Sequence, residues 1–356
     1  MNISILTGDL IIENSNLKAF TNGLGQAGNI AITVFNSFSL DNSDLSTEVG
    51  VSAQADGGNI EIQNAQSLTL TNSSISSKVA SNLPLKGEGN AGNITLSNIR
   101  AISLESGSKL TSSTDGIGNA GTIEVTHNDS LNLTDGSEIS TAVGKSGEGD
   151  AGAIVLNSNT LSLTGTSTIT SSTAGQGNAG NITLSDIGSI GLQKGSKLTS
   201  STEGIGNAGT IEVTNTDRFT LADGSQISTA VAETGEGNAG AIVLNSNTLS
   251  LTGASSITSS TAGQGNAGSI TVTGDGEIRL DDSTISTAIE PTGVANPDLP
   301  PSRITLSAGS VTLQNGATIT SETKGSEKLA QGGSGDAGTI EINAAETIDL
   351  TGASSI

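Results

Sequence analysis

The chain contains no cysteine, no tryptophan and no tyrosine, and it has four phenylalanines and one histidine among 356 residues. Without cysteine it can form neither a disulfide framework nor a thiolate metal site. With aromatic residues at 1% of the chain, it lacks the large side chains that usually fill a globular core. It also lacks the aromatic platforms that usually line sugar-cleaving grooves. An ordinary globular enzyme domain is therefore a poor description of this chain.

Positive charge is also scarce. Thirteen Lys and Arg residues stand against 35 Asp and Glu residues, which gives a formal net charge of −22 at pH 7. Nucleic acids and anionic membrane surfaces are bound through clustered cations, so we expect neither as a partner. No stretch approaches the roughly 18 apolar residues of a membrane span. The first residues, MNISILTGDL, lack the basic and apolar regions of a signal peptide, so an export signal would have to lie upstream.

Glycine is abundant instead, at 48 residues, and an acidic chain rich in Gly and Ser is by composition a candidate for disorder. The hydrophobic residues, 33% of the chain, are however arranged in regular pairs. The motif GNAGNI occurs at 89–94 and again at 177–182, and variants of it recur every 28 to 36 residues. Residues 89–176 and 177–264 form two 88-residue blocks that are identical at 68 of 88 aligned positions. Such an internal repeat is typical of a solenoid.

Each repeat contains three aliphatic pairs whose members are two residues apart, as in Ile94 and Leu96. This alternation predicts short strands with one face turned inward. Turn sequences such as ESGS (105–108) separate the second and third pairs and tolerate positive φ. The sequence thus predicts an all-β fold, a right-handed parallel β-helix with about one three-stranded coil per 28–36 residues.

We expect residues 1–356 to form a single β-helix repeat domain of about twelve coils. The chain stops in mid-coil at LTGASSI (350–356), a string that continues into a full third strand where it first occurs at 251–257. Neither end shows a capping element, and open β-helix ends invite edge pairing. The sequence therefore predicts a fragment of a longer protein.

A hydroxyl residue stands two positions after the third-strand aliphatic in nearly every repeat. We expect these side chains to point inward and to satisfy one another by hydrogen bonds along the axis, as structural groups and not as nucleophiles. This inward row comprises Thr47, Ser77, Ser112, Thr141, Ser171, Ser200, Thr229, Ser259, Thr287 and Ser321.

No residue stands out as catalytic, cofactor-binding or metal-ligating. The single histidine, His127, is replaced by Asn215 in the second block, so we interpret it as a surface loop residue. The best acidic pair for a carboxylate-dependent polysaccharide-cleaving enzyme is Asp281–Asp282. The pair occupies a turn, where Asp is common, and we expect no Arg or Lys beside it. The sequence therefore predicts that the protein is not an enzyme.

Signals for bound ions are weak. The segment GGSGDAGTI (332–340) resembles a Ca²⁺-binding nonapeptide, but Ala337 stands where that motif needs aspartate. The glycine-rich tetrads lead into strands, whereas a phosphate loop leads into a helix. We predict no cofactor, and at most weak Ca²⁺ binding by acidic loops such as 144–150.

Two surfaces are candidates for contact with other molecules. An outward hydroxyl row on the third strands suits an ice-binding face, although Lys109, Glu138 and Lys197 flank it. Insertions lengthen the loop after the third strand at 288–302 and 322–338, and variable loops on one side of a solenoid often mark the contacting side. The outward row comprises Thr111, Ser140, Thr170, Thr199, Ser228, Thr258, Ser286 and Thr320.

The recurring pattern GNAGxIxLxxxxxLxLxxGSxIxTS resembles the repeats of filamentous haemagglutinin-like exoproteins, in the acidic Gly/Ser/Thr-rich form common in cyanobacteria. The resemblance covers essentially the whole chain, but the N-terminal secretion domain of that family is not evident. It implies a right-handed β-helix exported across the outer membrane by two-partner secretion. It also implies an outer-membrane transporter as the partner of the missing domain, and it supplies no catalytic residues.

We therefore expect a non-enzymatic structural or adhesive passenger region, a stalk or adhesin scaffold, that is secreted or held at the cell surface. The expected partners are a surface polysaccharide or the surface of a host or neighbouring cell, and no nucleic acid. One alternative is a polysaccharide-processing β-helix lyase or hydrolase, which a stacked carboxylate cluster in a groove would favour. The other is an ice-binding surface, which a flat unbroken threonine row would favour.

Overall fold

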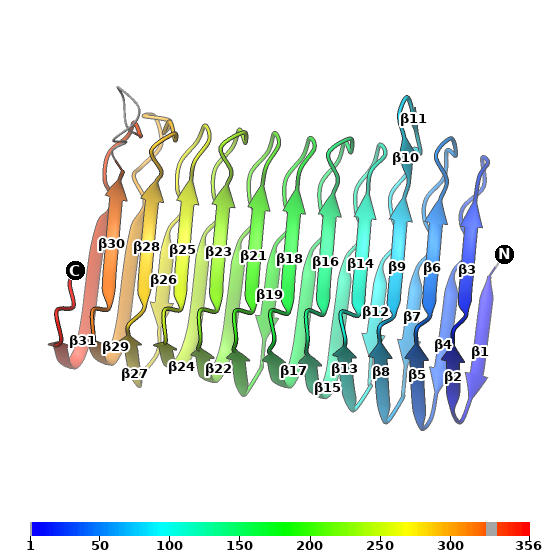
Figure 1. Ribbon diagram of the computed structural model, residues 1–356, viewed down its shortest axis with the longest axis horizontal. Coiled ribbons are helices and arrows are strands. Elements are labelled where there is room, and N and C mark those ends of the chain that lie inside the picture. The colour runs from blue at the N-terminus through cyan, green and yellow to red at the C-terminus, as the bar shows by residue number, and fades with distance from the viewer. Residues whose placement is uncertain (1, 325–332) are drawn as a thin grey trace.

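The computed structural model describes residues 2–324 and 333–356, and within them all regular secondary structure is β. The chain winds into a right-handed parallel β-solenoid, the fold that the repeats predict, with about 11 turns where the sequence suggests about twelve (Figure 1). None of the described residues belongs to a helix of the length and apolarity needed to cross a membrane.

Each coil has a first, a second and a third strand. The third strands form a parallel 11-stranded sheet, and Figure 1 shows them side by side along one face with the first strands behind. They are β3 (Asn16–Thr21), β6 (Asp44–Val49), β9 (Ser74–Val79), β14 (Lys109–Thr114), β16 (Glu138–Val143), β18 (Thr168–Thr173), β21 (Lys197–Thr202), β23 (Gln226–Val231), β25 (Ser256–Thr261), β28 (Thr284–Ile289) and β30 (Thr318–Thr323).

The first and second strands of successive coils belong to an 18-stranded sheet that bends between them. Separate first strands are β1 (Ile3–Thr7), β4 (Ile30–Val34), β7 (Ile60–Gln63), β12 (Ile94–Ser97), β19 (Ile182–Ser185) and β26 (Ile270–Thr273). Separate second strands are β2 (Leu10–Glu13), β5 (Ser37–Asp41), β8 (Ser67–Thr71), β13 (Ala101–Glu105), β20 (Ser189–Leu192) and β27 (Glu277–Asp281). Six longer strands run through the bend: β15 (Ile123–Leu133), β17 (Ile154–Leu163), β22 (Ile211–Leu221), β24 (Ile242–Thr252), β29 (Arg303–Gln314) and β31 (Thr339–Leu350).

The core consists of aliphatic columns that run along the axis. Ile94 pairs with Ile60 in the preceding coil and with Ile123 in the following one, and all three are fully buried. Because each coil places nearly the same side chain at the same register, small aliphatic residues pack densely without aromatic residues. Burial of one such side chain stabilises the fold by about 1.5–3 kcal/mol, so the repetition of these columns accounts for most of the core.

The last glycine of each tetrad is required by close stacking of the backbone. A Cβ atom at Gly92 would lie 2.0 Å from the carbonyl oxygen of Gly58, and one at Gly121 would lie 2.2 Å from the carbonyl oxygen of Gly92. Without a shift of the backbone, these positions leave no room for a side chain. The tetrad repeats along the chain because this contact repeats.

The inward hydroxyl row is buried as predicted, except that Ser321 at its end is half-buried. Its hydrogen-bond partners differ from the prediction. The Ser112 hydroxyl donates to the carbonyl oxygen of Gly92 at 3.1 Å and accepts from the N–H of Gly121 at 2.8 Å. The tetrad backbone faces the third strand across the coil and takes these hydroxyls as partners. Axial contacts between hydroxyls, such as Thr141 to Ser171 at 3.0 Å, are secondary.

The loops between each third strand and the next first strand lie together along one edge, the upper edge in Figure 1. We call this the loop edge. It carries the antiparallel hairpin β10 (Ser81–Asn82) and β11 (Leu85–Lys86), and the insertion predicted at 288–302 lies on it. Of the insertion predicted at 322–338, residues 325–332 lie outside the described residues.

Candidate functional site

Exposed aliphatic side chains gather on the loop edge. Ile117, Ile205 and Val294 stand in one column of parallel bridges, three coils apart, with exposed fractions of 41%, 54% and 51%. Exposed apolar groups that gather on one part of a surface are typical of a contact site. From the third coil to the last but one, the large hydrophobic residues that the structure describes as exposed lie on this edge: Leu83, Leu85, Ile117, Ile205, Val294 and Leu299.

The insertion at 288–302 adds a small hollow to the loop edge. The hollow has a volume of about 160 Å³, and its walls include Ile289, Pro297, Leu299 and Pro301. These side chains make it partly apolar. The predicted contact loop thus brings apolar side chains together around a hollow, which an insertion that only faces solvent does not need.

The carboxylates of the acidic loop 144–150 are already engaged by the protein. Lys86 forms an ion pair with Glu148 at 2.7 Å, and an Asp150 side-chain oxygen accepts the backbone N–H of Asn178 at 2.7 Å. Among the described residues, no group of three or more His, Asp or Glu side chains is placed to hold a metal ion. Weak Ca²⁺ binding by this loop stays a prediction.

His127 is exposed at the bend in β15, where the first-strand part of the coil leads into the second-strand part, and it has a φ of 57°. The equivalent Asn215 has φ of 54°. Asn and His are among the residues that adopt this left-handed conformation most readily. The position therefore requires a residue that readily adopts the left-handed conformation. Asn215 meets this requirement in the second block without an imidazole.

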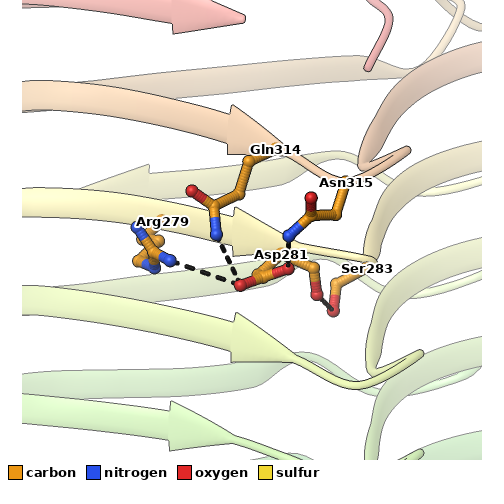
Figure 2. Close-up of polar contacts among 5 residues, drawn as sticks. All are labelled: Arg279, Asp281, Ser283, Gln314 and Asn315. Carbon is orange, nitrogen blue, oxygen red and sulfur yellow. Dashed lines mark hydrogen bonds and ion pairs between the residues drawn. The ribbon is translucent and has the colours of Figure 1, made fainter. Parts of the chain in front are cut away.

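Asp281 lies at the corner between the second and third strands, where it ties two coils together (Figure 2). One carboxylate oxygen accepts from Asn315 at 2.7 Å, and the other accepts from Gln314 at 2.6 Å and from Arg279 at 3.2 Å. The Ser283 hydroxyl donates to the backbone carbonyl of Asp281 at 2.9 Å. The expectation of no cation beside this acid is therefore wrong. Arg279 shares its strand face at a spacing of two, a signal that the sequence did carry.

These donors set the chemistry of the Asp281 carboxyl. Hydrogen bonds from Asn315 and Gln314, followed by the charge of Arg279, hold its pKa below the usual value. A general acid needs the opposite shift. The neighbouring Asp282 has φ of 49°, which agrees with its interpretation as a turn residue. The pair is arranged as a structural tie between coils.

The outward hydroxyl row on the third strands is continuous and in register. Thr111 pairs with Ser140, and the pairing continues coil by coil to Thr320. Some neighbours are hydrogen-bonded to each other, as Thr199 is to Thr170 at 2.9 Å. The flanking charges expected from the sequence are present in the neighbouring column. The structure thus contains both the hydroxyl row that favours the ice-binding alternative and the flanking charges that disfavour it.

An asparagine ladder runs along the tetrads, and sequence reasoning missed it. The side-chain oxygen of the second tetrad residue accepts the backbone N–H of its equivalent in the next coil, at 2.6–2.9 Å. The recurrence of Asn or Asp at this position was the available signal. The accepting residues are Asp56, Asn90, Asn119, Asp150, Asn178, Asn207, Asn238 and Asn266.

Comparison of the chain with protein-family models, with curated proteins and with solved structures gave no match. The β-helix and its repeats are therefore established by the structure, while the resemblance to filamentous haemagglutinin-like exoproteins rests on the sequence pattern.

Proposed function

We propose that this chain is a non-enzymatic structural and adhesive region of a large secreted or surface-attached exoprotein. The observation that carries the proposal is the continuous parallel sheet of eleven stacked third strands, which gives a stiff rod with one specialised edge. A rod built by repeating one short sequence unit displays an extended surface, and such a surface suits a stalk or an adhesin scaffold.

The route to the surface follows from the resemblance alone. As in filamentous haemagglutinin-like exoproteins of the cyanobacterial type, we propose two-partner secretion, with an outer-membrane transporter as the partner of that family's N-terminal secretion domain. The location would then be extracellular or on the cell surface. A chain without cysteine is compatible with that location, since it needs no redox control.

The loop edge supports the adhesive part of the proposal. It combines exposed aliphatic residues with the long loops, whereas the outward row of the third strands from Thr111 to Thr320 carries only Thr and Ser. Apolar side chains surrounded by polar loops are common in protein interaction sites. We therefore propose the loop edge as the side that touches another cell surface.

The test is binding of the labelled, purified chain to intact cells. The double variant Ile117→Asn/Ile205→Asn changes the loop edge at equivalent positions of the two blocks. The matched control, Val155→Asn/Val243→Asn, makes the same chemical change on the outer face of β17 and β24. We expect the loop-edge variant to lose most of its binding and the control to keep it. Equal binding by both variants, or no binding by the parent chain, would contradict an adhesive loop edge.

A polysaccharide-processing enzyme is the competing function, and the same preparation tests it. Reducing-sugar release from polysaccharides, with and without millimolar Ca²⁺, would reveal turnover. The ice-binding alternative is tested by thermal hysteresis of the same chain. We expect neither activity.

A further inference from the structure

A polar hollow lies at the bend where the first-strand part of a coil leads into the second-strand part. It spans three coils, formed by β22, by β24 and by the pair β26–β27. We call it the bend hollow. It has a volume of about 570 Å³ and adjoins a second hollow of about 600 Å³ that reaches β31 and shares Gly274 and Asp275 with it. The two hollows follow one another along the axis, and the bend that carries them lies on the edge opposite the loop edge, the lower edge in Figure 1. The main lining residues of the bend hollow are Asn215, Asp217, Asn245, Asn247, Gly274 and Asp275.

The bend hollow lies where the side chain carried by the equivalent residue three coils earlier is missing. Three coils before Gly274, Asp186 accepts hydrogen bonds from Asn157 at 3.3 Å and from Asn215 at 2.9 Å. Eighty-eight residues further on, Gly274 stands at the equivalent of Asp186. Asn245, the equivalent of Asn157, therefore has no such acceptor. A Cβ atom at Gly274 would lie 2.0 Å from a backbone carbonyl oxygen, so a side chain cannot fill the space.

Asn215 donates its side-chain amide to Asp186, but the other polar side chains of the bend hollow that are named below have no partner among the described residues. Asp217 corresponds to Asp129, whose carboxylate is bound by Arg100 at 3.1 Å and by Asn159 at 3.1 Å. At Asp217 the described contact is a hydroxyl donated to its backbone carbonyl, and its carboxylate has no partner among the described residues. The same holds for the side chains of Asn245, Asn247 and Asp275. Thr216, 4% exposed in the wall of the hollow, also has a hydroxyl without a partner in the described structure.

We propose that the bend hollow binds a neutral linear polysaccharide along the axis of the rod. Amides and carboxylates in successive coils offer both donors and acceptors, which vicinal sugar hydroxyls can pair with. The coil spacing of about 4.8 Å is close to the length of one hexose unit. The carboxylates of Asp217 and Asp275, without a paired cation, disfavour an anionic polymer. This inference deepens the adhesive part of the proposed function and rests on it.

The duplication supplies a matched control. We would measure binding of cellohexaose, maltohexaose and mannohexaose to the 356-residue chain by calorimetry, with a hexamer of galacturonic acid as the anionic comparison. Asp217→Ala/Asn247→Ala removes two exposed groups from the bend hollow, and Asp129→Ala/Asn159→Ala removes the equivalent pair three coils earlier. We expect a neutral hexasaccharide to bind at least about tenfold more weakly to the first variant, since two polar contacts are lost. The second variant should bind like the parent.

Equal weakening in both variants, preference for the galacturonate hexamer, Ca²⁺ binding at these residues without sugar binding, or no neutral hexasaccharide binding would each overturn the proposal. The cell-binding assay separates this failure from failure of the proposed function. A chain that still adheres to cells through the loop edge would leave the adhesin in place and remove only the bend hollow.

Discussion

The side-chain oxygen of Asn178 accepts the backbone N–H of Asn207 at 2.9 Å. Asn207 in turn accepts the N–H of Asn238 in the next coil at 2.8 Å. The tetrad backbone bends away from the strand ladder, and these amides supply the acceptors that its N–H groups would otherwise lack. Repeating coils are thus joined at their corners as well as along their strands.

Asn207→Ala is expected to lower the stability of the rod by about 1 kcal/mol, because it leaves the N–H of Asn238 without its acceptor. The control is Asn132→Ala, on the outer face of β15, where the side chain makes no hydrogen bond with another described residue. Urea unfolding followed by circular dichroism measures both. An equal shift of midpoint in the two variants would show that the ladder contributes nothing specific.

Thr173→Val and Thr202→Val are expected to stabilise the protein. Both hydroxyls are fully buried without a partner, and the same column carries Val143 one coil before Thr173 and Val231 one coil after Thr202. Removing a buried unsatisfied hydroxyl at nearly constant volume should add about 1 kcal/mol or more per site. Thr229→Val is the control and should destabilise, because its hydroxyl donates to the carbonyl of Gly240. Thermal unfolding decides, and stabilisation by all three changes would refute the assignment of unpaired hydroxyls.

Gly209→Ala is expected to prevent correct stacking of its coil. Its Cβ would lie 2.2 Å from the carbonyl oxygen of Gly180, and the tetrad cannot move aside without breaking the register. Gly191→Ala, in β20, has no atom within 4 Å of the added Cβ and should be neutral or stabilising by about 0.5 kcal/mol. Soluble yield and unfolding midpoint separate the two outcomes. A well-folded Gly209→Ala protein would contradict the close-stacking account.

Asp281→Asn is expected to lower the unfolding temperature at pH 7, and less so in acid. Asn315, Gln314 and Arg279 hold the pKa of the folded carboxyl below its unfolded value. Between those two pKa values the native state binds fewer protons than the unfolded state, so its stability rises with pH. The contribution is complete above about pH 5 and is lost as the pH falls through the lowered pKa. A difference from the parent that stays constant down to about pH 3 would contradict this; Asp282→Asn controls for charge removal.

The strand pattern and the inward rows could be predicted because they depend on spacing alone. Aliphatic residues two apart must share a face, and a repeat of 28 to 36 residues brings equivalent faces together in the next coil. The coil therefore follows from local pattern plus repetition. For the same reason the burial of Ser112 and its equivalents was predictable.

Side-chain partners could not be predicted in the same way. The choice of Gly92 over a neighbouring hydroxyl as the partner of Ser112 depends on how the coil closes across its interior. The tie from Asp281 to Asn315 joins two coils of unequal length, so no fixed spacing announces it. The bend hollow arises where Gly274 departs from the equivalent residues of other coils. An analysis based on recurring residues does not detect a single departure of this kind.

The most direct test of an adhesive, non-enzymatic β-helix is a titration of the purified chain with polysaccharides and with whole cells, in which binding and sugar release are measured in the same samples. The account predicts saturable binding with the polysaccharide recovered unchanged. Release of sugar products would contradict it, and so would the absence of binding to every surface and polysaccharide.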